Sequence, residues 1–277
     1  MLAATLLDCF VRLRLGLLTP GPQGAIWIHP WCKRILWAIG VEYSVSGPLP
    51  DLEAGKLALV SNHLSYLDVL LYSAARPFIM VSKMQVRYWP FFGWLTAQCG
   101  TVYVQRSDFK GGQTQTHSDV NRLMAEAYRS GLPVLFFPEG TTTEGAQIGE
   151  FRRGLFPSLL ENEVPLKAAA VRFEFTQPNP GATIAEDVCF IGDASLGPHL
   201  LGLIGLKGVK ARIQFGDETV AGKDAAELAH NSREQVISIF DRLSADEMAA
   251  KAKSVEDVFD RPVDGLGSIY RDGGASR

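Results

Sequence analysis

The sequence has few cysteines, no long uninterrupted apolar run and no strong excess of either charge. No stretch reaches the about 18 uncharged apolar residues that a bilayer-crossing helix needs, so we expect no ordinary transmembrane helix. Residues 1–18 are apolar but contain Asp8, Arg12 and Arg14, and no cleavage pattern follows, which argues against a secretory signal. The net charge of −3 gives no reason to expect nucleic acid as a partner.

The cysteines are widely separated, with no Cys-x-x-Cys pair and no histidine at metal-ligand spacing: Cys9, Cys32, Cys99 and Cys189. This pattern predicts reduced thiols, as in the cytosol, and neither a disulfide framework nor a zinc site. A Gly-x-Ser-x-Gly motif is also missing, which excludes the commonest serine hydrolases.

The 277 residues are 47% hydrophobic and 21% charged, enough for a proper core. Short apolar runs bounded by turns predict strands at 57–61, 78–82, 101–105, 133–137, 166–175, 186–191 and 209–215. Helical stretches lie between or after them, at 66–75, 85–98, 114–130 and 223–243. This alternation predicts an α/β fold with a largely parallel sheet flanked by helices.

Two amphipathic helices are expected before this domain, at 2–18 and 25–41. In the first helix, four apolar residues lie on one face: Leu6, Phe10, Leu13 and Leu17. In the second, four apolar residues follow one another at four-residue intervals: Trp27, Trp31, Ile35 and Ile39. Tryptophan and basic residues suit a membrane surface, so we predict that these helices lie on a bilayer; the alternative is a hairpin packed on the core. The predicted division is 1–42 membrane-associating, 43–245 catalytic and 246–277 a polar tail.

The first candidate site follows the predicted strand 57–61 and contains His63 and Asp68. Residues five apart do not share a face of a regular helix. Ser65 and Asp68, however, have the spacing of a capping box, which would leave His63 in the preceding loop facing a first-turn carboxylate. A carboxylate on one ring nitrogen makes the other nitrogen a general base. A helix cap beside a surface histidine is the alternative.

The second candidate site is the Gly- and Thr-rich segment 137–145 after the predicted strand 133–137. Such a loop at a strand end is the usual ligand edge of an α/β sheet, although an ordinary turn has the same composition.

The order of these motifs resembles the glycerolipid acyltransferase family over roughly residues 40–220. The matching blocks are NHxxxxD at 62–68, GTVYVQR at 100–106, FPEGT at 137–141 and VPLKAAAV at 164–171. The family includes bacterial lysophosphatidic acid acyltransferases and their lysophospholipid and lyso-ornithine-lipid relatives.

The resemblance implies that His63, oriented by Asp68, deprotonates the acceptor hydroxyl, which attacks the thioester of acyl-CoA or acyl-carrier protein. No cofactor or metal is implied. Implied partners are a membrane bilayer and a lysolipid acceptor, with the enzyme peripheral or monotopic on the cytoplasmic side, expected to be a bacterial inner membrane. Implied substrate-binding positions are Asn62, Arg106, Glu139, Gly140, Thr141 and Thr142. A non-catalytic lipid-binding protein of the same fold is the alternative.

One position departs from the branch that forms phosphatidic acid, which usually has Arg directly after Glu-Gly-Thr. This chain has Thr142, which cannot make a bidentate contact to phosphate, although Arg106, Arg152 and Arg153 could compensate. The motif is closer to the lysophosphatidylcholine and lyso-ornithine-lipid side, so lysophosphatidic acid is not expected as the sole acceptor.

Two further features stay open. Lys83 follows a predicted strand and either faces coenzyme A phosphates or is a solvated surface lysine. The apolar run 196–206 either meets lipid, lines an acyl channel or is a packed loop. Within it, His199 has no carboxylate at useful spacing and is not expected to be catalytic.

Overall fold

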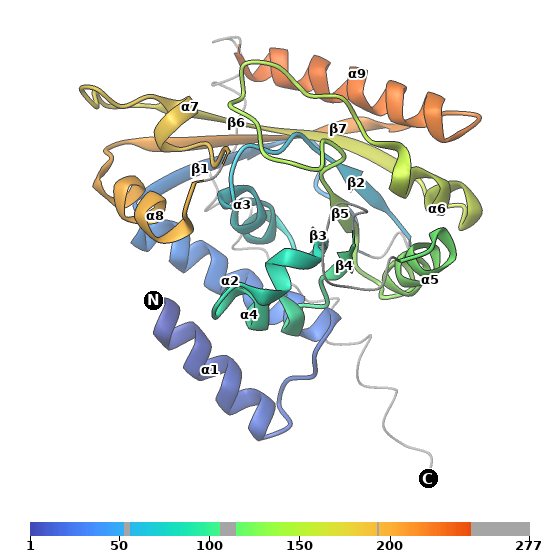
Figure 1. Cartoon of the computed structure of the whole chain (residues 1–277), viewed down its shortest axis with the longest axis horizontal. Coiled ribbons are helices and arrows are strands. Elements are labelled where there is room, and N and C mark those ends of the chain that lie inside the picture. Colours follow the sequence, from blue (N-terminus) through green and yellow to red (C-terminus); the bar gives the residue numbers. More distant parts are fainter. Residues whose placement is uncertain (53–55, 106–114, 193, 245–277) are drawn as a thin grey trace.

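The computed structural model describes residues 1–52, 56–105, 115–192 and 194–244, and it contains a seven-stranded sheet with helices on both faces (Figure 1). The strand order is β1-β7-β6-β2-β5-β3-β4. The strands are β1 (Val41–Ser46), β2 (Ala58–Val60), β3 (Ile79–Lys83), β4 (Val102–Val104), β5 (Val134–Phe136), β6 (Leu166–Phe175) and β7 (Val209–Val220).

Within the described residues the neighbouring strands run parallel, except β6 and β7, which are antiparallel. The predicted α/β fold with a largely parallel sheet is therefore confirmed. In the centre of the sheet Val60 of β2 pairs with Phe136 of β5. Because parallel strands end at the same edge, the residues that follow β2 and β5 lie next to each other.

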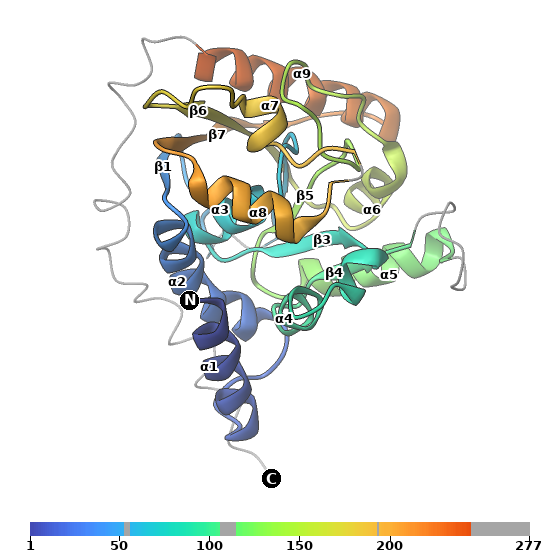
Figure 2. The same ribbon diagram turned by 60° about the vertical axis from the view of Figure 1, so that its left-hand side comes forward.

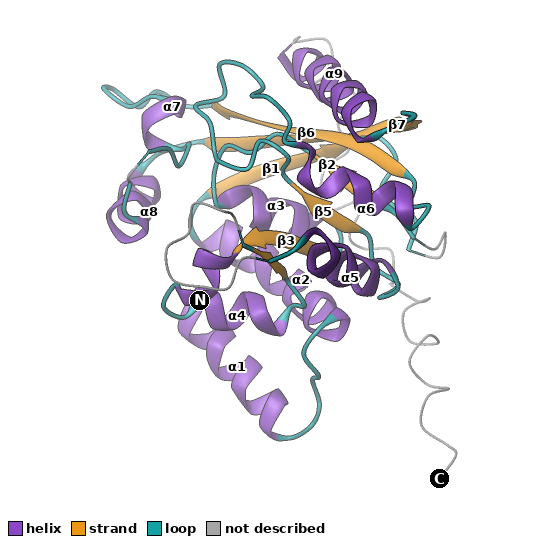
Figure 3. Cartoon of the chain, turned by 45° about the vertical axis from the view of Figure 1, so that its right-hand side comes forward, coloured by secondary structure: helices purple, strands orange, loops and turns teal. Residues whose placement is uncertain are grey.

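Alternating side chains of the central strands belong to two separate cores. Figure 3 shows the helices that lie on the two faces of the sheet. Leu59 and Leu135 belong to the core under α1 (Leu2–Arg14), α2 (Pro22–Ala38) and α3 (Leu67–Ala75). Val60 and Phe136 face the opposite core, under α5 (His117–Tyr128), α6 (Phe156–Glu161) and α9 (Ala225–Ser244). β2 and β5 are apolar throughout because both of their faces are buried, whereas β3 begins with three buried apolar residues and ends in the half-buried Ser82 and Lys83.

The prediction of a strand at 186–191 is wrong. The chain forms α7 (Ile184–Asp187) there, followed by a loop. The side chain of Thr183 accepts a hydrogen bond from the backbone N–H of Glu186, and Asp187 accepts one from the N–H of Thr183. This capping pattern stabilises a helical turn and outweighs the apolar character of the residues that follow.

Three other segments refine the prediction. β1 was not predicted, and it pairs with β7 at one edge of the sheet. The predicted helix 85–98 is a 3-10 helix η1 (Met84–Tyr88) followed by α4 (Phe92–Gln98). The apolar run 196–206 forms a helix, α8 (Leu196–Gly205).

The N-terminal helices α1 and α2 pack against the core as well as against each other (Figure 2). Trp27 and Trp31 donate indole hydrogen bonds to the carboxylate of Asp8, at 2.8 and 3.3 Å. The expected apolar face of α1 is divided, because Leu6 and Leu13 contact the core. Phe10 and Leu17 of the same expected face are exposed.

Membrane association of residues 1–42 and the division of the chain at residues 42 and 245 stay predictions. In the described ranges no helix is long and apolar enough to cross a bilayer. The predicted tail 246–277 lies outside the described residues.

Candidate active site

His63 and Asp68 meet at the carboxyl edge of the sheet, between β2 and α3. The Nδ1 of His63 lies 2.8 Å from Oδ2 of Asp68, and the ring stacks on Phe137 with centroids 4.1 Å apart. The Asp68 side chain is fully buried, whereas one fifth of the His63 side chain is exposed. The arrangement fixes the ring between a carboxylate and an aromatic face and leaves Nε2 as the nitrogen that a substrate can reach.

The capping geometry differs from the predicted box. Helix α3 begins at Leu67 with Tyr66 as N-cap, and the hydroxyl of Ser65 makes no hydrogen bond within the described residues. Of the two hydrogen bonds of a capping box, only the one to the carboxylate is present. Oδ2 of Asp68 accepts the backbone N–H groups of Leu64 and Ser65, at 2.6 and 3.0 Å. The carboxylate, and not the serine hydroxyl, therefore closes the turn that carries His63.

Glu139 holds the backbone of His63 from the neighbouring strand end. Its Oε1 accepts the N–H of His63 at 2.8 Å, and its Oε2 accepts the N–H of Gly149 at 2.8 Å. Burial raises the pKa of the Glu139 carboxyl above its ordinary value, and the two backbone hydrogen bonds oppose this rise. Both carboxylate oxygens are thus occupied by the protein itself.

Asn62 ties the same loop to β6. Its Oδ1 accepts the N–H of Val171 and its Nδ2 donates to the carbonyl of Val171, both at 2.9 Å. Beside it, the hydroxyls of Ser61 and Tyr72 lie 2.6 Å apart in the core. Burial raises the pKa of Tyr72, which keeps this phenol protonated. Sequence reasoning missed Ser61 and Tyr72 because a buried hydroxyl pair has no local signature.

The segment after β5 wraps around the histidine loop. Gly140 has φ +69°, in the region that favours glycine, and a Cβ there would meet Arg152. The backbone N–H of Thr143 donates to the carbonyl of His63 at 2.9 Å, and the hydroxyl of Thr142 donates to the carbonyl of Phe190.

A hollow of about 540 Å³ opens on the outer side of this segment; it is lined by Thr142, Thr143, Glu144, Ala146, Gln147 and Ile191. Thr141 is exposed beside it. The structure therefore brings together Asn62, His63 and Asp68 of the block at 62–68 with Glu139 of the block at 137–141 and the adjacent Thr142, and the predicted Gly140 and Thr141 lie in the same loop.

An aromatic cluster covers the start of α3. The hydroxyl of Tyr66 lies 3.2 Å from Nδ1 of His199 on α8, and Nε2 of His199 lies 3.0 Å from the carbonyl of Cys189. Phe190 packs edge-on against Tyr66, and Trp89 packs edge-on against Phe190. Both ring nitrogens of His199 are used structurally, in keeping with the expectation that it is not catalytic.

Two further positions were predicted from the sequence. Arg106 is outside the described residues. Lys83 is the half-buried last residue of β3, and the structure leaves both of its expected roles open.

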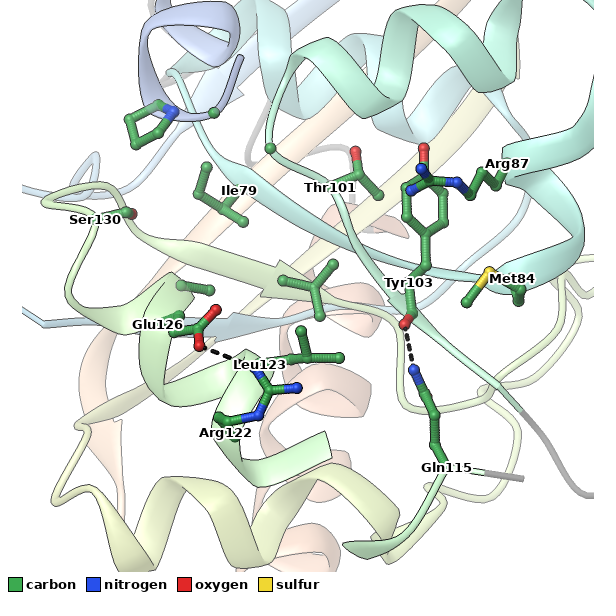
Figure 4. A pocket seen from close by; sticks show the side chains of 15 residues that line it. Ile79, Met84, Arg87, Thr101, Tyr103, Gln115, Arg122, Leu123, Glu126 and Ser130 are labelled. Carbon is green, nitrogen blue, oxygen red and sulfur yellow. Dashed lines mark hydrogen bonds and ion pairs between the residues drawn. The ribbon is translucent and has the colours of Figure 1, made fainter. Parts of the chain in front are cut away.

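A pocket of about 620 Å³ lies beside β4 and α5, with Arg87, Tyr103 and Gln115 on one side and Arg122 on another (Figure 4). None of the candidate site residues that the structure describes lines it.

Comparisons with known proteins identify a matching family and several relatives. The family model described as Acyltransferase matches residues 42–172, a range that includes every candidate site residue. A lyso-ornithine lipid O-acyltransferase of Pseudomonas aeruginosa is 33% identical over 74% of this chain and 75% of its own length. A 1-acyl-sn-glycerol-3-phosphate acyltransferase of Neisseria meningitidis is 28% identical over 70% of this chain and 71% of its own.

The fold has a counterpart among solved structures. The crystal structure of the 1-acyl-sn-glycerophosphate acyltransferase PlsC from Thermotoga maritima superposes with a TM-score of 0.55, covering 80% of each chain at 14% identity. The family match, together with the Pseudomonas relative that is 33% identical over 75% of its length, shows that the chain belongs to the glycerolipid acyltransferase family.

Proposed function

We propose that the protein transfers a fatty acyl group from a thioester of coenzyme A or acyl-carrier protein to the hydroxyl of a lysolipid, with His63 as general base and Asp68 as its orienting partner. The observation that carries this proposal is the 2.8 Å contact between His63 Nδ1 and Asp68 Oδ2. It holds the ring with Nδ1–H toward the carboxylate and a basic Nε2 on the more exposed side.

The proposed reaction needs no covalent intermediate between the acyl group and the enzyme. Nε2 of His63 takes the proton of the acceptor hydroxyl. At the same time the oxygen of this hydroxyl attacks the carbonyl carbon of the thioester. The tetrahedral intermediate collapses, the carbon–sulfur bond breaks, and the proton passes from His63 to the departing thiolate. Asp68 stabilises the imidazolium that exists between these two events.

Two buried side chains position the base without touching the substrate. Glu139 holds the backbone N–H of His63, and Asn62 holds the preceding residue against Val171. Their contribution is orientation, which matters because a displacement of about 1 Å at a reacting centre costs on the order of 10²-fold in rate.

The hollow beside this loop favours an acceptor whose head group carries an ammonium. Of the residues that the structure describes, its lining includes the exposed carboxylate of Glu144 and the hydroxyls of Thr142 and Thr143, and no Arg or Lys side chain. A phosphate monoester would meet a like charge there, whereas an ornithine head group would pair with Glu144. Relatives named lyso-ornithine lipid O-acyltransferase agree with this choice.

The acyl transfer takes place at a membrane surface, where the lysolipid resides. Exposed apolar side chains of α1, among them Leu7, Phe10 and Val11, accompany the basic residues Arg12 and Arg14. This composition suits a helix that lies in the interface of an anionic leaflet, and we expect a peripheral position on the cytoplasmic side.

The test of catalysis is His63→Ala. With purified enzyme, acyl-CoA and lysolipid, we expect product formation, read by mass spectrometry, to fall by about 10²- to 10⁴-fold. The control is His230→Ala, since His230 is exposed on α9, and it should keep the wild-type rate. Turnover in His63→Ala equal to that of the control would refute the proposed base.

A panel of lyso-ornithine lipid, lysophosphatidic acid and lysophosphatidylcholine, each offered with acyl-CoA and with acyl-carrier protein, identifies both substrates. We expect the highest kcat/KM with lyso-ornithine lipid. A preference for lysophosphatidic acid would overturn the role given to Glu144. Lysolipid binding without any acylated product would favour a lipid-binding protein that only retains the fold.

A further inference from the structure

The exposed large apolar side chains are unevenly distributed. In the described part of the chain all but Leu160 belong to Met1, α1 and the turn after it, the C-terminal end of α2, residues 88–94, or α8. Figures 1 and 2 place α1, α2, α4 and α8 on the face of the sheet opposite α6 and α9. Exposed apolar side chains gathered on one side of a domain mark an interaction site.

Residues 88–94, here called the aromatic turn, contribute three aromatic side chains to these exposed residues. The segment reads YWPFFGW, and its exposed side chains are Tyr88, Phe91 and Trp94, which are 70%, 64% and 38% exposed. Exposed aromatic rings concentrated in seven residues are expected at a bilayer interface, where one end of each ring is apolar and the other meets water.

The backbone holds Phe91 outward at an energetic cost. Phe91 has φ +63° and ψ −49°, and the N–H of Phe92 donates to the carbonyl of Pro90 at 2.7 Å. This is a γ-turn of the uncommon positive-φ kind, which is strained for any residue with a side chain. Gly93 completes the turn, since a Cβ there would lie 2.0 Å from the carbonyl oxygen of Arg87. Strain at an exposed phenylalanine indicates that its position serves a function.

The charge of the segment fits an anionic surface. Between Asp68 and Asp108 the sequence contains no acidic residue, while Lys83 and Arg87 precede the aromatic turn directly. The guanidinium of Arg87 lies 5.3 Å from the ring centre of Tyr103, which supports the base of the turn (Figure 4). Basic residues beside interfacial aromatics are attracted by anionic lipid head groups.

The aromatic turn is connected both to the candidate active site and to the N-terminal helices. Trp89 packs on Phe190, which packs on Tyr66 at the start of α3. On the other side the N–H of Gly21, between α1 and α2, donates to the carbonyl of Gln98 at the end of α4, at 2.9 Å. The turn therefore lies between the apolar α1 region and the loop of His63.

We propose that the aromatic turn is a membrane-contacting element that inserts Tyr88, Phe91 and Trp94 into the interface of an anionic bilayer. It is distinct from the N-terminal helices. By keeping the start of α3 beside the lipid, it lets a lysolipid reach His63 without passing through water. Only this last consequence rests on the proposed function; the membrane contact itself does not.

The binding test uses sedimentation with vesicles of phosphatidylethanolamine and phosphatidylglycerol, and with vesicles of phosphatidylcholine alone. The full-length Phe91→Ser, Trp94→Ser double variant should bind the anionic vesicles about tenfold more weakly or worse, because it loses most of the apolar area offered by the turn. The matched control is Leu160→Ser on α6, which is 39% exposed on the other side of the sheet and should bind as the wild type does.

Phe91→Gly separates lost binding from lost folding. Glycine accepts a positive φ, so this variant should unfold at the same or a higher temperature while binding anionic vesicles more weakly. Equal vesicle affinity of the wild type, the double variant and Phe91→Gly would overturn the proposal. A change of oligomeric state in light scattering, with vesicle binding unaltered, would overturn it as well and identify a second copy of this chain as the partner of the turn.

Activity measurements keep this inference apart from the proposed function. The double variant should acylate monomeric lysolipid, below its critical micelle concentration, at the wild-type rate, and vesicle-embedded lysolipid more slowly. If the wild type acylates neither form, the proposed function fails while the sedimentation result still decides the membrane contact. Equal loss of rate with both forms would mean that the turn acts within the active site and not at the membrane.

Discussion

Oε1 of Glu139 accepts the backbone N–H of His63 at 2.8 Å, although the two residues are 76 positions apart in the chain. A second carboxylate, that of Asp68, holds the ring of the same histidine at 2.8 Å. One carboxylate thus fixes where the residue lies and the other fixes how its ring is turned. Residues from two different strand ends therefore position one histidine.

Replacing Asp68 by Asn should reduce kcat by about 10²- to 10⁴-fold, with a smaller change in KM. The amide can still accept a backbone N–H, so the turn survives, but it carries no charge to stabilise the imidazolium in the transition state. Steady-state kinetics with vesicle-embedded lysolipid measures both constants. An unchanged kcat would remove Asp68 from the mechanism.

Asn62→Ala should lower the free energy of unfolding by about 2–4 kcal/mol, because it leaves the buried N–H and C=O of Val171 without partners. We also expect a lower kcat, since the residue before His63 loses its attachment to β6. Urea unfolding followed by circular dichroism gives the stability change.

The chain offers a matched control for this substitution. Asn179 bridges the N–H and C=O of Lys207 in the same way, at 2.8 Å each, but in an exposed position. Water can replace the bridge in Asn179→Ala, so its unfolding free energy should fall by less than about 1 kcal/mol, with full activity. Equal losses of unfolding free energy in Asn62→Ala and Asn179→Ala would mean that burial does not decide how much such a bridge stabilises the protein.

Glu139 predicts a pH dependence of stability. Burial raises the pKa of its carboxyl in the folded protein above the ordinary value of 4.5, so the folded state binds this proton more tightly than the unfolded state. The stabilisation that the protonated Glu139 gives the folded state is then fully present below the ordinary pKa. It is lost as the pH rises through the raised pKa of the folded state. Glu139→Gln should therefore flatten the fall of unfolding free energy above about pH 4.5.

Urea titrations of the wild type and Glu139→Gln at several pH values provide the measurement. The glutamine should also be less stable by about 1–3 kcal/mol near neutral pH, since its amide group cannot accept the N–H of Gly149 and of His63 together. Parallel pH profiles of the two proteins would show that Glu139 does not titrate differently on folding.

The sequence was sufficient to predict the sheet and the meeting of His63 with Asp68, because short apolar runs and a loop histidine before a first-turn carboxylate are local patterns. It was insufficient for contacts made across the fold. The bridge from Asn62 to Val171 spans 109 positions, and the stacking of His63 on Phe137 depends on β2 lying beside β5. The strand predicted at 186–191 failed because a capping threonine preceded the apolar residues.

Thr142→Arg should shift the acceptor preference toward lysophosphatidic acid. Arginine offers two parallel N–H donors to a phosphate, and it would also counter the charge of Glu144 in the same hollow. We expect the ratio of kcat/KM for lysophosphatidic acid to that for lyso-ornithine lipid to rise by about tenfold, equivalent to about 1.4 kcal/mol.

Competition between the two lysolipids in one vesicle preparation, read by mass spectrometry, measures this ratio directly. Thr142→Val is the matched control, because it also removes the hydroxyl that donates to Phe190 but adds no charge. If both variants change the ratio equally, the shift comes from the loosened loop and not from the guanidinium. An arginine variant that keeps the wild-type ratio would mean that the acceptor head group binds away from residue 142, with the exposed Arg152 and Arg153 as the next positions to substitute.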